Sequence, residues 1–169
     1  VIAPRELKTK IKNEIGEFLV EQTLLKTASS SSPVEGESWP ALTSKAYKKL
    51  KLKEAGNEQA NMELTGQMMD DLTYKTTKEG IKVGFFTKEA WKADGHNKFS
   101  GGENGTPKRR FLPGEGQEYT SDIQAGIDAI IADNLVGSAG FSKTDFADVK
   151  NKNDLYAILE DELDENLSR

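Results

Sequence analysis

Two short segments in the middle of the chain constrain its fold most strongly, because in each of them polar residues alternate with residues suited to a buried face. The buried-face positions are Leu72, Tyr74 and Thr76 in the first segment, and Ile81, Val83 and Phe85 in the second. This period of two is typical of β-strands. The connection Lys78-Glu79-Gly80 is short and contains glycine, which favours a β-hairpin over about residues 72–86. Two strands alone do not bury a stable face, so the hairpin needs helices to cover it.

Two helices are predicted to provide that cover. Near the start of the chain, apolar residues recur at helical spacings, at Leu7, Ile11, Ile15, Phe18, Leu19 and Leu25. A second helix is predicted at residues 122–135, where Ser121 is a suitable N-cap and Gln124 completes a capping box. We therefore expect an α+β fold, in which a small antiparallel sheet, made of the hairpin plus a further strand, packs against both helices.

Two intervening segments are less regular. Residues 43–54 are helix-competent, with Thr43 or Ser44 as the cap, and we interpret their five lysines as a solvated face rather than a DNA site. Residues 87–120 are predicted to form a long loop of the kind that serves function or becomes ordered by a partner. The core candidates in this loop are Trp91, Phe99, Phe111 and Leu112.

The chain is predicted to divide into a domain at residues 1–136 and an acidic helical C-terminal extension at residues 137–169. Gly137-Ser138-Ala139-Gly140 has the composition of a hinge between them. The extension carries an apolar stripe at helical spacing, at Leu155, Ile158, Leu159, Leu163 and Leu167. This stripe docks either on its own subunit or on a neighbouring one.

Composition and motifs argue against several functions. The chain has no cysteine, which removes disulfides and zinc-thiolate sites, and it has no apolar run long enough to cross a membrane. A net charge of -5 argues against general nucleic-acid coating. The sole histidine, His96, lies two residues from Asp94, but a metal site needs more ligands than these two. Neither a Gly-x-Ser-x-Gly elbow nor a phosphate-binding loop is present. We therefore predict a protein that is not an enzyme and has no catalytic, cofactor-binding or metal-binding site.

Four segments in order resemble the tailed-phage virion-morphogenesis, or tail-completion, proteins. They are Ser32 to Leu42 with Trp39-Pro40, Leu64-Thr65-Gly66-Gln67-Met68, His96 to Gly102, and Pro107 to Pro113. The resemblance extends over about residues 4–135. The chain departs from the family pattern at Met68, where leucine is usual, and at Arg110, where proline is common.

The resemblance implies a small α+β subunit that forms a homo-oligomeric ring, as a hexamer, at the head-tail junction. There it would complete the tail as a tail terminator or neck protein, after assembly in the host cytoplasm, beside other neck, connector, tail tube or sheath proteins. It implies no membrane and no specific nucleic acid as a partner. The alternative is a nucleic-acid-binding or metal-dependent nuclease accessory protein.

The candidate interface residues lie in three parts of the chain. They are Lys108, Arg109, Arg110, Phe111 and Leu112, then Trp39, and then Leu155, Leu159 and Leu163 of the extension. Arg109 and Arg110 are suited to contact a neighbour's carboxylates. Phe111 and Leu112 either supply buried anchor area at that interface or fix the loop to the core, and both roles are compatible. Trp39 either fills the edge of the core or contacts a partner.

Overall fold

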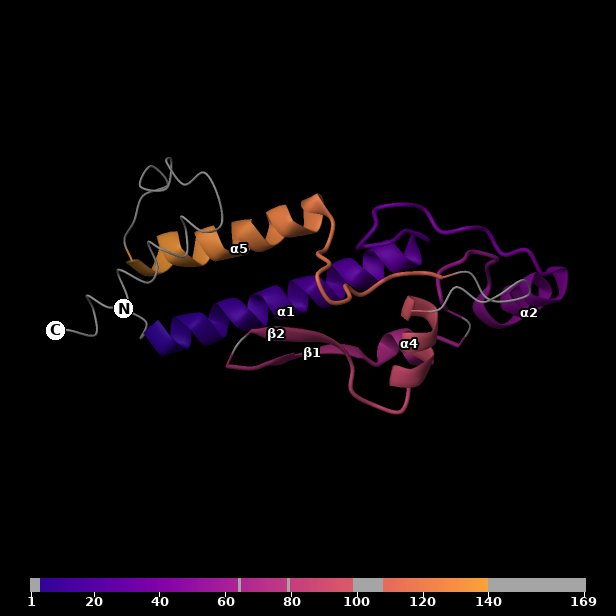
Figure 1. The fold of residues 1–169 in the computed structure, drawn as a ribbon, viewed down its shortest axis with the longest axis horizontal. Helices are drawn as coiled ribbons and strands as arrows, with labels where there is room; N and C mark the ends of the chain where they lie inside the picture. The colour runs from indigo at the N-terminus through magenta and orange to yellow at the C-terminus, as the bar shows by residue number, and fades with distance from the viewer. Residues whose placement is uncertain (1–3, 64, 79, 99–107, 140–169) are drawn as a thin grey trace.

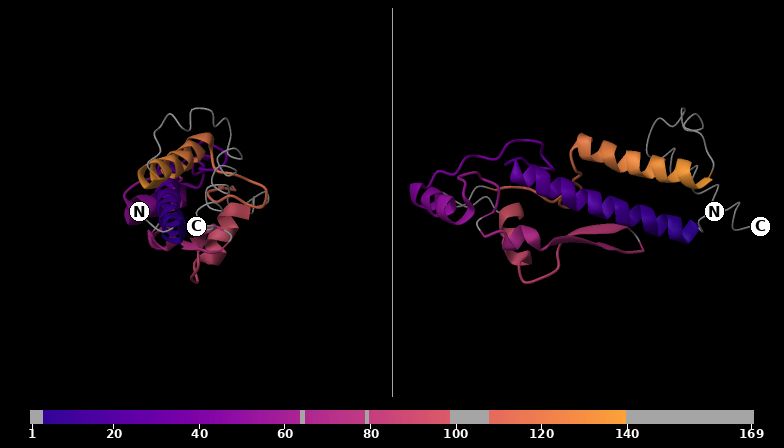
Figure 2. Two further views of the ribbon diagram at one scale, coloured as in Figure 1. Left: turned by 90° about the vertical axis from the view of Figure 1, so that its left-hand side faces the viewer. Right: turned by 180° about the vertical axis from the view of Figure 1, so that it is seen from behind.

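The computed structural model describes residues 4–63, 65–78, 80–98 and 108–139. Its longest element is α1 (Pro4–Ala28), which lies between α5 (Ser121–Ala139) on one side and the hairpin of β1 (Leu72–Thr76) and β2 (Ile81–Phe85) on the other (Figures 1 and 2). The two strands are antiparallel, with Tyr74 opposite Val83. These elements confirm the predicted α+β fold and the hairpin packed against the N-terminal helix.

The three layers approach one another at two glycines of the helices. A Cβ atom at Gly16 of α1 would lie 2.2 Å from the Tyr74 ring of β1, and a Cβ atom at Gly126 of α5 would lie 2.2 Å from the Phe18 ring of α1. Such distances are far below van der Waals contact, so glycine is what lets both aromatic rings come this close to a helix backbone. In addition, Lys12 Nζ donates to the carbonyl of Thr77 at 2.7 Å, which ties α1 to the end of the hairpin.

The core between α1 and α5 follows the helical pattern of the sequence. We call it the helix cluster, and its buried members are Ile15, Leu19, Ile123, Ile131 and Leu135. Ile81 and Val83 of the hairpin pack against its edge. The α5 helix packs chiefly on α1, so it covers the hairpin less than the sequence predicts. Leu25 also departs from the predicted apolar face, because its side chain is 57% exposed.

The remaining helices are shorter. The basic helix is confirmed as α2 (Lys45–Ala55), with Ser44 as its N-cap and Gly56 in the left-handed conformation at its end. It lies beyond the C-terminal end of α1 (Figure 1). A single turn, α3 (Gln67–Asp70), leads into β1, and α4 (Ala90–Lys98) follows β2.

Four details of the predicted fold need correction. The sheet in the described residues has only two strands, so no further strand is found there. The predicted loop 87–120 contains α4, because residues 90–98 form regular helical hydrogen bonds. The last helix begins at Ser121 rather than after it, since the Gln124 amide donates to the Thr120 carbonyl. That helix continues through residues 137–139, where the sequence predicts the start of a hinge.

Candidate functional site

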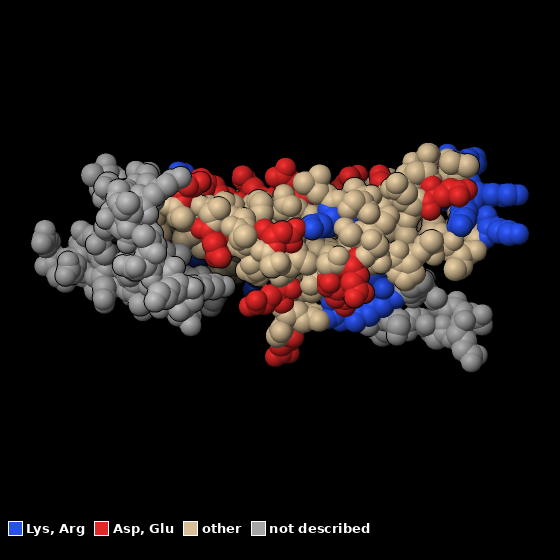
Figure 3. Space-filling model, turned by 90° about the horizontal axis from the view of Figure 1, so that it is seen from above, with Lys and Arg blue, Asp and Glu red and all other residues tan. Residues whose placement is uncertain are grey.

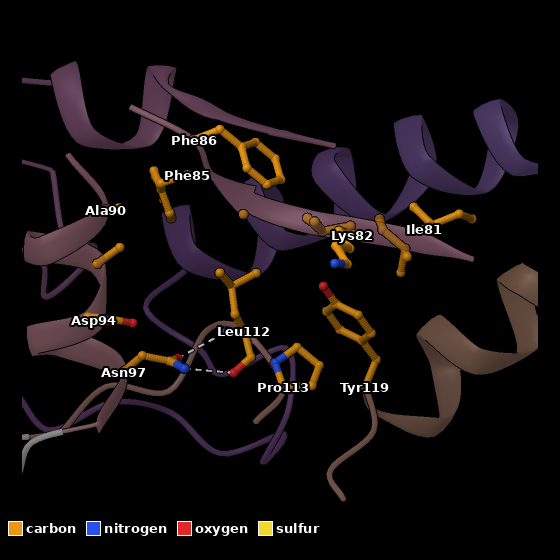
Figure 4. A pocket seen from close by; sticks show the side chains of 14 residues that line it. Ile81, Lys82, Phe85, Phe86, Ala90, Asp94, Asn97, Leu112, Pro113 and Tyr119 are labelled. Atoms are coloured by element: carbon orange, nitrogen blue, oxygen red, sulfur yellow. Dashed lines mark hydrogen bonds between the residues drawn. The ribbon is translucent and has the colours of Figure 1, made fainter. Parts of the chain in front are cut away.

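The segment 109–112 is held in place by the end of α4. The side chain of Asn97 accepts a hydrogen bond from the Phe111 amide at 2.9 Å. It also accepts one from the Leu112 amide at 3.0 Å and donates to the Leu112 carbonyl at 2.9 Å (Figure 4). A further hydrogen bond is made by the Arg109 amide, which donates to the His96 carbonyl at 2.9 Å. One amide side chain thus satisfies three backbone groups of an otherwise irregular segment.

A second segment, the loop after α1, is fastened to the same place by a serine. The Ser32 hydroxyl donates to the Arg110 carbonyl at 2.6 Å and accepts from the amides of Val34 and Glu35. Ser32 is fully buried. The guanidinium of Arg110 lies 3.7 Å from the Glu35 carboxylate, which adds an ion pair across the two segments.

Apolar side chains complete this meeting point, which we call the junction. The apolar side chains that are buried in the junction form a cluster, which we call the loop cluster. They are Trp39, Met68, Met69, Leu72, Ala93 and Phe111. Phe111 has no exposed surface, and its ring meets that of Phe85 edge to face with 5.8 Å between the centroids. Edge-to-face contact is a favourable geometry for aromatic rings. The junction is therefore a packed core made from loop segments and short elements.

Three cationic or titratable side chains lie beside the junction. The Lys51 ammonium, on a side chain only 1% exposed, donates to Asn61 Oδ1 at 2.6 Å and to the Glu63 carbonyl. Burial lowers the pKa of Lys51, and the Arg109 charge lowers it further against the opposing effect of Glu63. Burial, and then Arg109, also lowers the pKa of His96. The neutral imidazole is thus favoured.

The guanidinium of Arg109 is unusual in this cluster. Arg109 is 5% exposed, yet among the described residues its Nε atom has no hydrogen-bond partner and no carboxylate pairs with it. Burial lowers its pKa, although an arginine remains charged in proteins. The Nδ1 atom of His96 is likewise buried, with no hydrogen-bond partner in the part of the chain that the structure describes. The cluster therefore has unused donor capacity and a local positive charge.

An open cavity of about 520 Å³ lies between β2, α4 and the segment after Leu112 (Figure 4). Val83 and Phe85, from β2, line it together with Leu112 and Tyr119. Asp94 and Asn97 of α4 supply polar groups at its side. Burial raises the pKa of Tyr119, so its hydroxyl stays protonated and can donate a hydrogen bond.

Besides Leu25 of α1, large apolar side chains of the described residues are exposed on two further parts of the surface. Trp91 of α4 is 71% exposed, which corrects its prediction as a core residue, and Phe86 nearby in sequence is 41% exposed. On α2 the exposed apolar residues are Tyr47, Leu50 and Leu52. Lysines and arginines gather at the end of the molecule where α2 lies (Figure 3). Lys51 is the exception to the solvated lysine face predicted for this helix, because it points into the protein.

The predicted interface residues have different positions. Phe111 and Trp39 are buried in the loop cluster and Leu112 packs against it, which fits the core role, one of the two roles that the sequence predicts for these residues. Arg109 does not face outward as expected, because burial at the junction holds it inside, and Arg110 is turned towards Glu35. Their part in an interface stays a prediction. Lys108 is partly exposed, and Leu155, Leu159 and Leu163 lie outside the described residues.

Three residues that hold the structure at the junction or beside it are not predicted by the sequence. Asn97 follows the lone histidine, which drew attention as a metal ligand instead. Ser32 ends a run of four serines that has the composition of a loop, yet its position before Pro33 is a signal for a side-chain-stabilised turn. Lys51 gives no signal, since four other lysines surround it in the same helix.

The described residues give two negative findings. They contain no group of three or more His, Cys, Asp or Glu side chains placed to hold a metal ion. None of the described helices combines the length and the apolar character that crossing a membrane requires. In comparisons with known proteins, no family model, no curated protein and no solved structure matches this chain.

Proposed function

We propose that this chain is a structural virion protein that forms a ring at the head-tail junction of a tailed phage and completes the tail. One observation carries the proposal. The four segments that resemble the tail-completion proteins are far apart in the sequence, yet their described parts meet at the junction, through Ser32, Trp39, Met68, Asn97 and Phe111. Residues 64, 99–102 and 107 of those segments lie outside the described residues.

The chemistry of the junction also favours a structural role. Asn97 and Ser32 use their polar atoms to hold backbone groups in place. Phe111 and Trp39 are buried as packing residues. The polar atoms of Asn97 and Ser32 are thus committed to backbone groups, and such bonded networks rigidify a scaffold. A rigid scaffold with exposed apolar and basic surfaces suits a subunit that works by contact.

A ring adds a geometric requirement, because each subunit must present two different patches that fit each other. The molecule is long in one direction, with α2 at one end and the start of α1 at the other (Figure 1). The two ends of the subunit are therefore far apart, which leaves room for two separate contact patches. By resemblance we place the subunit on the tail side of the joint.

The direct test is to mix purified filled heads, purified tails and this protein without metal or nucleotide. The proposal expects joined particles in electron micrographs only when the protein is present. If heads and tails stay separate, while the protein binds DNA in a salt-sensitive manner or cleaves it with a divalent metal, the alternative accessory function is correct instead.

A surface variant refines this assay. Trp91→Ser removes the most exposed aromatic side chain of the described residues, and exposed aromatic residues are frequent anchors of protein interfaces. We expect fewer joined particles and an unchanged melting temperature. Lys88→Ser, an exposed change a few residues earlier, is the matched control. Equal joining by both variants would exclude Trp91 as a contact residue.

A further inference from the structure

The outward face of α2 is built differently from its inward face. Lys51 is buried and bonded to Asn61, so it fixes which side of the helix points inward. Lys49 and Lys53 lie two residues to either side of Lys51, which places both of them on the opposite, outward face. Around the helix axis, Leu50 and Leu52 lie on either side of these two lysines, and they are 44% and 51% exposed. The outward face of α2 is therefore both basic and apolar.

A segment of this chain has the complementary character. Residues 153–168 contain six Asp or Glu and no Lys or Arg. They also carry the predicted apolar stripe, which includes Leu155, Leu159 and Leu163. An acidic segment with a leucine stripe matches a basic surface with exposed leucines in both charge and apolar area. We propose that residues 153–168 of one copy dock on the outward face of α2 in a second copy.

The geometry of the fold favours a second copy over the same one. The α5 helix runs antiparallel to α1, and Leu135 near its end packs in the cluster that Leu7 also contacts (Figure 1). The α2 helix lies beyond the other end of α1, which at 25 residues is about 37 Å long.

Only residues 140–152 connect α5 to the acidic segment. Fully extended, these residues span at most roughly 45 Å. Docking on its own α2 would need a nearly straight connection, which is entropically unfavourable. Docking on a neighbour has no such requirement. It joins two different patches, and repeated contacts of this kind close into a ring or continue as a filament.

This inference specifies a subunit contact for the ring and rests on the proposed function for its biological meaning. Two variants of the full chain test it. The first, Lys49→Glu with Lys53→Glu, disables the α2 surface but keeps the acidic segment. The second, Leu159→Asp with Leu163→Asp, disables the acidic segment but keeps α2. Native mass measurement and sedimentation over a concentration series then report the size of each protein alone and of the mixture.

We expect the wild-type chain to self-associate and each variant alone to be monomeric, with a dissociation constant at least about tenfold higher. The mixture should form a one-to-one dimer, because the acidic segment of the first variant meets the intact α2 of the second. Raising the salt concentration should weaken wild-type association. Far-UV circular dichroism checks that both variants remain folded, which the exposure of Lys49 and Lys53 favours.

The matched control is Lys8→Glu with Lys88→Glu, which makes the same change in net charge at exposed positions away from α2. It should self-associate like the wild type. A wild-type chain that is monomeric throughout, variants that associate normally, or a mixture without dimers would each overturn the proposal. In the joining assay, normal joining by the Lys49→Glu, Lys53→Glu variant would sink this contact alone, whereas no joining by the wild type would sink the proposed function.

Discussion

The two hydrophobic clusters of this molecule are built in different ways. The helix cluster consists of side chains that α1 and α5 place at regular helical spacing. The loop cluster gathers Trp39, Met68 and Phe111 from segments separated by tens of residues, and side-chain hydrogen bonds from Ser32 and Asn97 hold its backbone. Val83 of β2 packs against both clusters, so the hairpin connects them.

The difference teaches how each cluster is stabilised. In the helix cluster, backbone hydrogen bonds are satisfied within the helices, and apolar burial decides most of the packing, with the Lys26–Asp122 ion pair and the Asn134–Glu14 hydrogen bond beside it. In the loop cluster, the backbone lacks regular partners, so polar side chains must satisfy it before the apolar side chains can pack. We therefore expect the loop cluster to depend on single residues more strongly than the helix cluster does.

The largest expected effect is at Phe111. Phe111→Ala removes a ring with no exposed surface and should lower the free energy of unfolding by about 3–5 kcal/mol. Ile123→Ala, 1% exposed in the helix cluster, should cost about 2–5 kcal/mol. Denaturant unfolding gives both values. Hydrogen exchange should show increased local opening at residues 109–112 only for the Phe111 variant, and equal opening in both variants would contradict the distinction.

Asn97 tests whether the loop cluster depends on side-chain hydrogen bonds. Asn97→Ala leaves the Phe111 and Leu112 amides without their acceptor, which we expect to cost about 2–3 kcal/mol. Asn134 of α5 is the comparison, because its amide donates to the Ile130 carbonyl, a group that a helix already satisfies, and to the half-exposed Glu14 carboxylate of α1, so its loss leaves no backbone amide without an acceptor. Asn134→Ala should cost about 1 kcal/mol. Thermal unfolding that ranks the two variants the other way would refute the dependence on side-chain hydrogen bonds.

Gly16 tests the contact between α1 and the hairpin. Gly16→Ala forces a methyl group into the Tyr74 ring and should destabilise the protein by about 1–3 kcal/mol. Gly95→Ala in α4 is the control, since an added Cβ atom there meets nothing within 4 Å. It should instead stabilise the helix by about 0.5–1 kcal/mol. Opposite shifts of the melting temperature are the expected result, and two shifts of the same sign would show that the contact is loose.

Arg109 brings a charge close to the loop cluster. Because its guanidinium is buried without an ion pair among the described residues, Arg109→Met should change the stability of the isolated chain by less than about 1 kcal/mol, or increase it. If a neighbour's carboxylate pairs with Arg109, the same variant should assemble poorly. Chemical unfolding and native mass measurement separate the two effects. A loss of stability above about 3 kcal/mol would mean that Arg109 has a partner within its own chain.

The smallest expected effect concerns Asp122, whose carboxylate lies 2.6 Å from Lys26 Nζ and joins the start of α5 to the end of α1. Hydrogen bonding from Lys26 lowers the pKa of Asp122 from 3.8 to about 2. A lowered folded-state pKa stabilises the protein above about pH 4, and this contribution is lost as the pH falls towards 2. Because the side chain is 56% exposed, we expect less than about 1 kcal/mol.

The measurement is the stability of the wild type and of Asp122→Asn from pH 7 to pH 2. The difference between the two proteins should shrink as the pH falls from 4 to 2 and should be smaller in high salt. A difference that is independent of pH would assign the effect to something other than this charge.

The two clusters also differ in how far the sequence predicts them. Helical spacing and strand alternation indicate α1, α5 and the hairpin, because each pattern is local and repeats. The approach of Trp39, Met68 and Phe111 depends on contacts across the chain, and no local pattern encodes these. The composition of residues 87–120 concealed α4, since Gly95 and the polar residues around it favour helix weakly.

The sequence also predicts the candidate site only in part, and the difference lies in single side chains. Phe111 and Leu112 were identified because large apolar residues in an irregular segment usually have a packing partner. The inward direction of the Arg109 side chain was not predicted, because burial of a charged residue depends on tertiary packing that the sequence does not display. Asn97 and Ser32 act on backbone groups, and such roles depend on which segments meet in the fold.

The proposed function is tested most directly by electron micrographs of particles assembled without this protein. We expect filled heads that are not attached to tails, together with tails whose ends are abnormal or uncapped. Supplying the wild-type chain should restore complete particles. Normal virions in its absence would contradict the proposal that this chain completes the joint between head and tail.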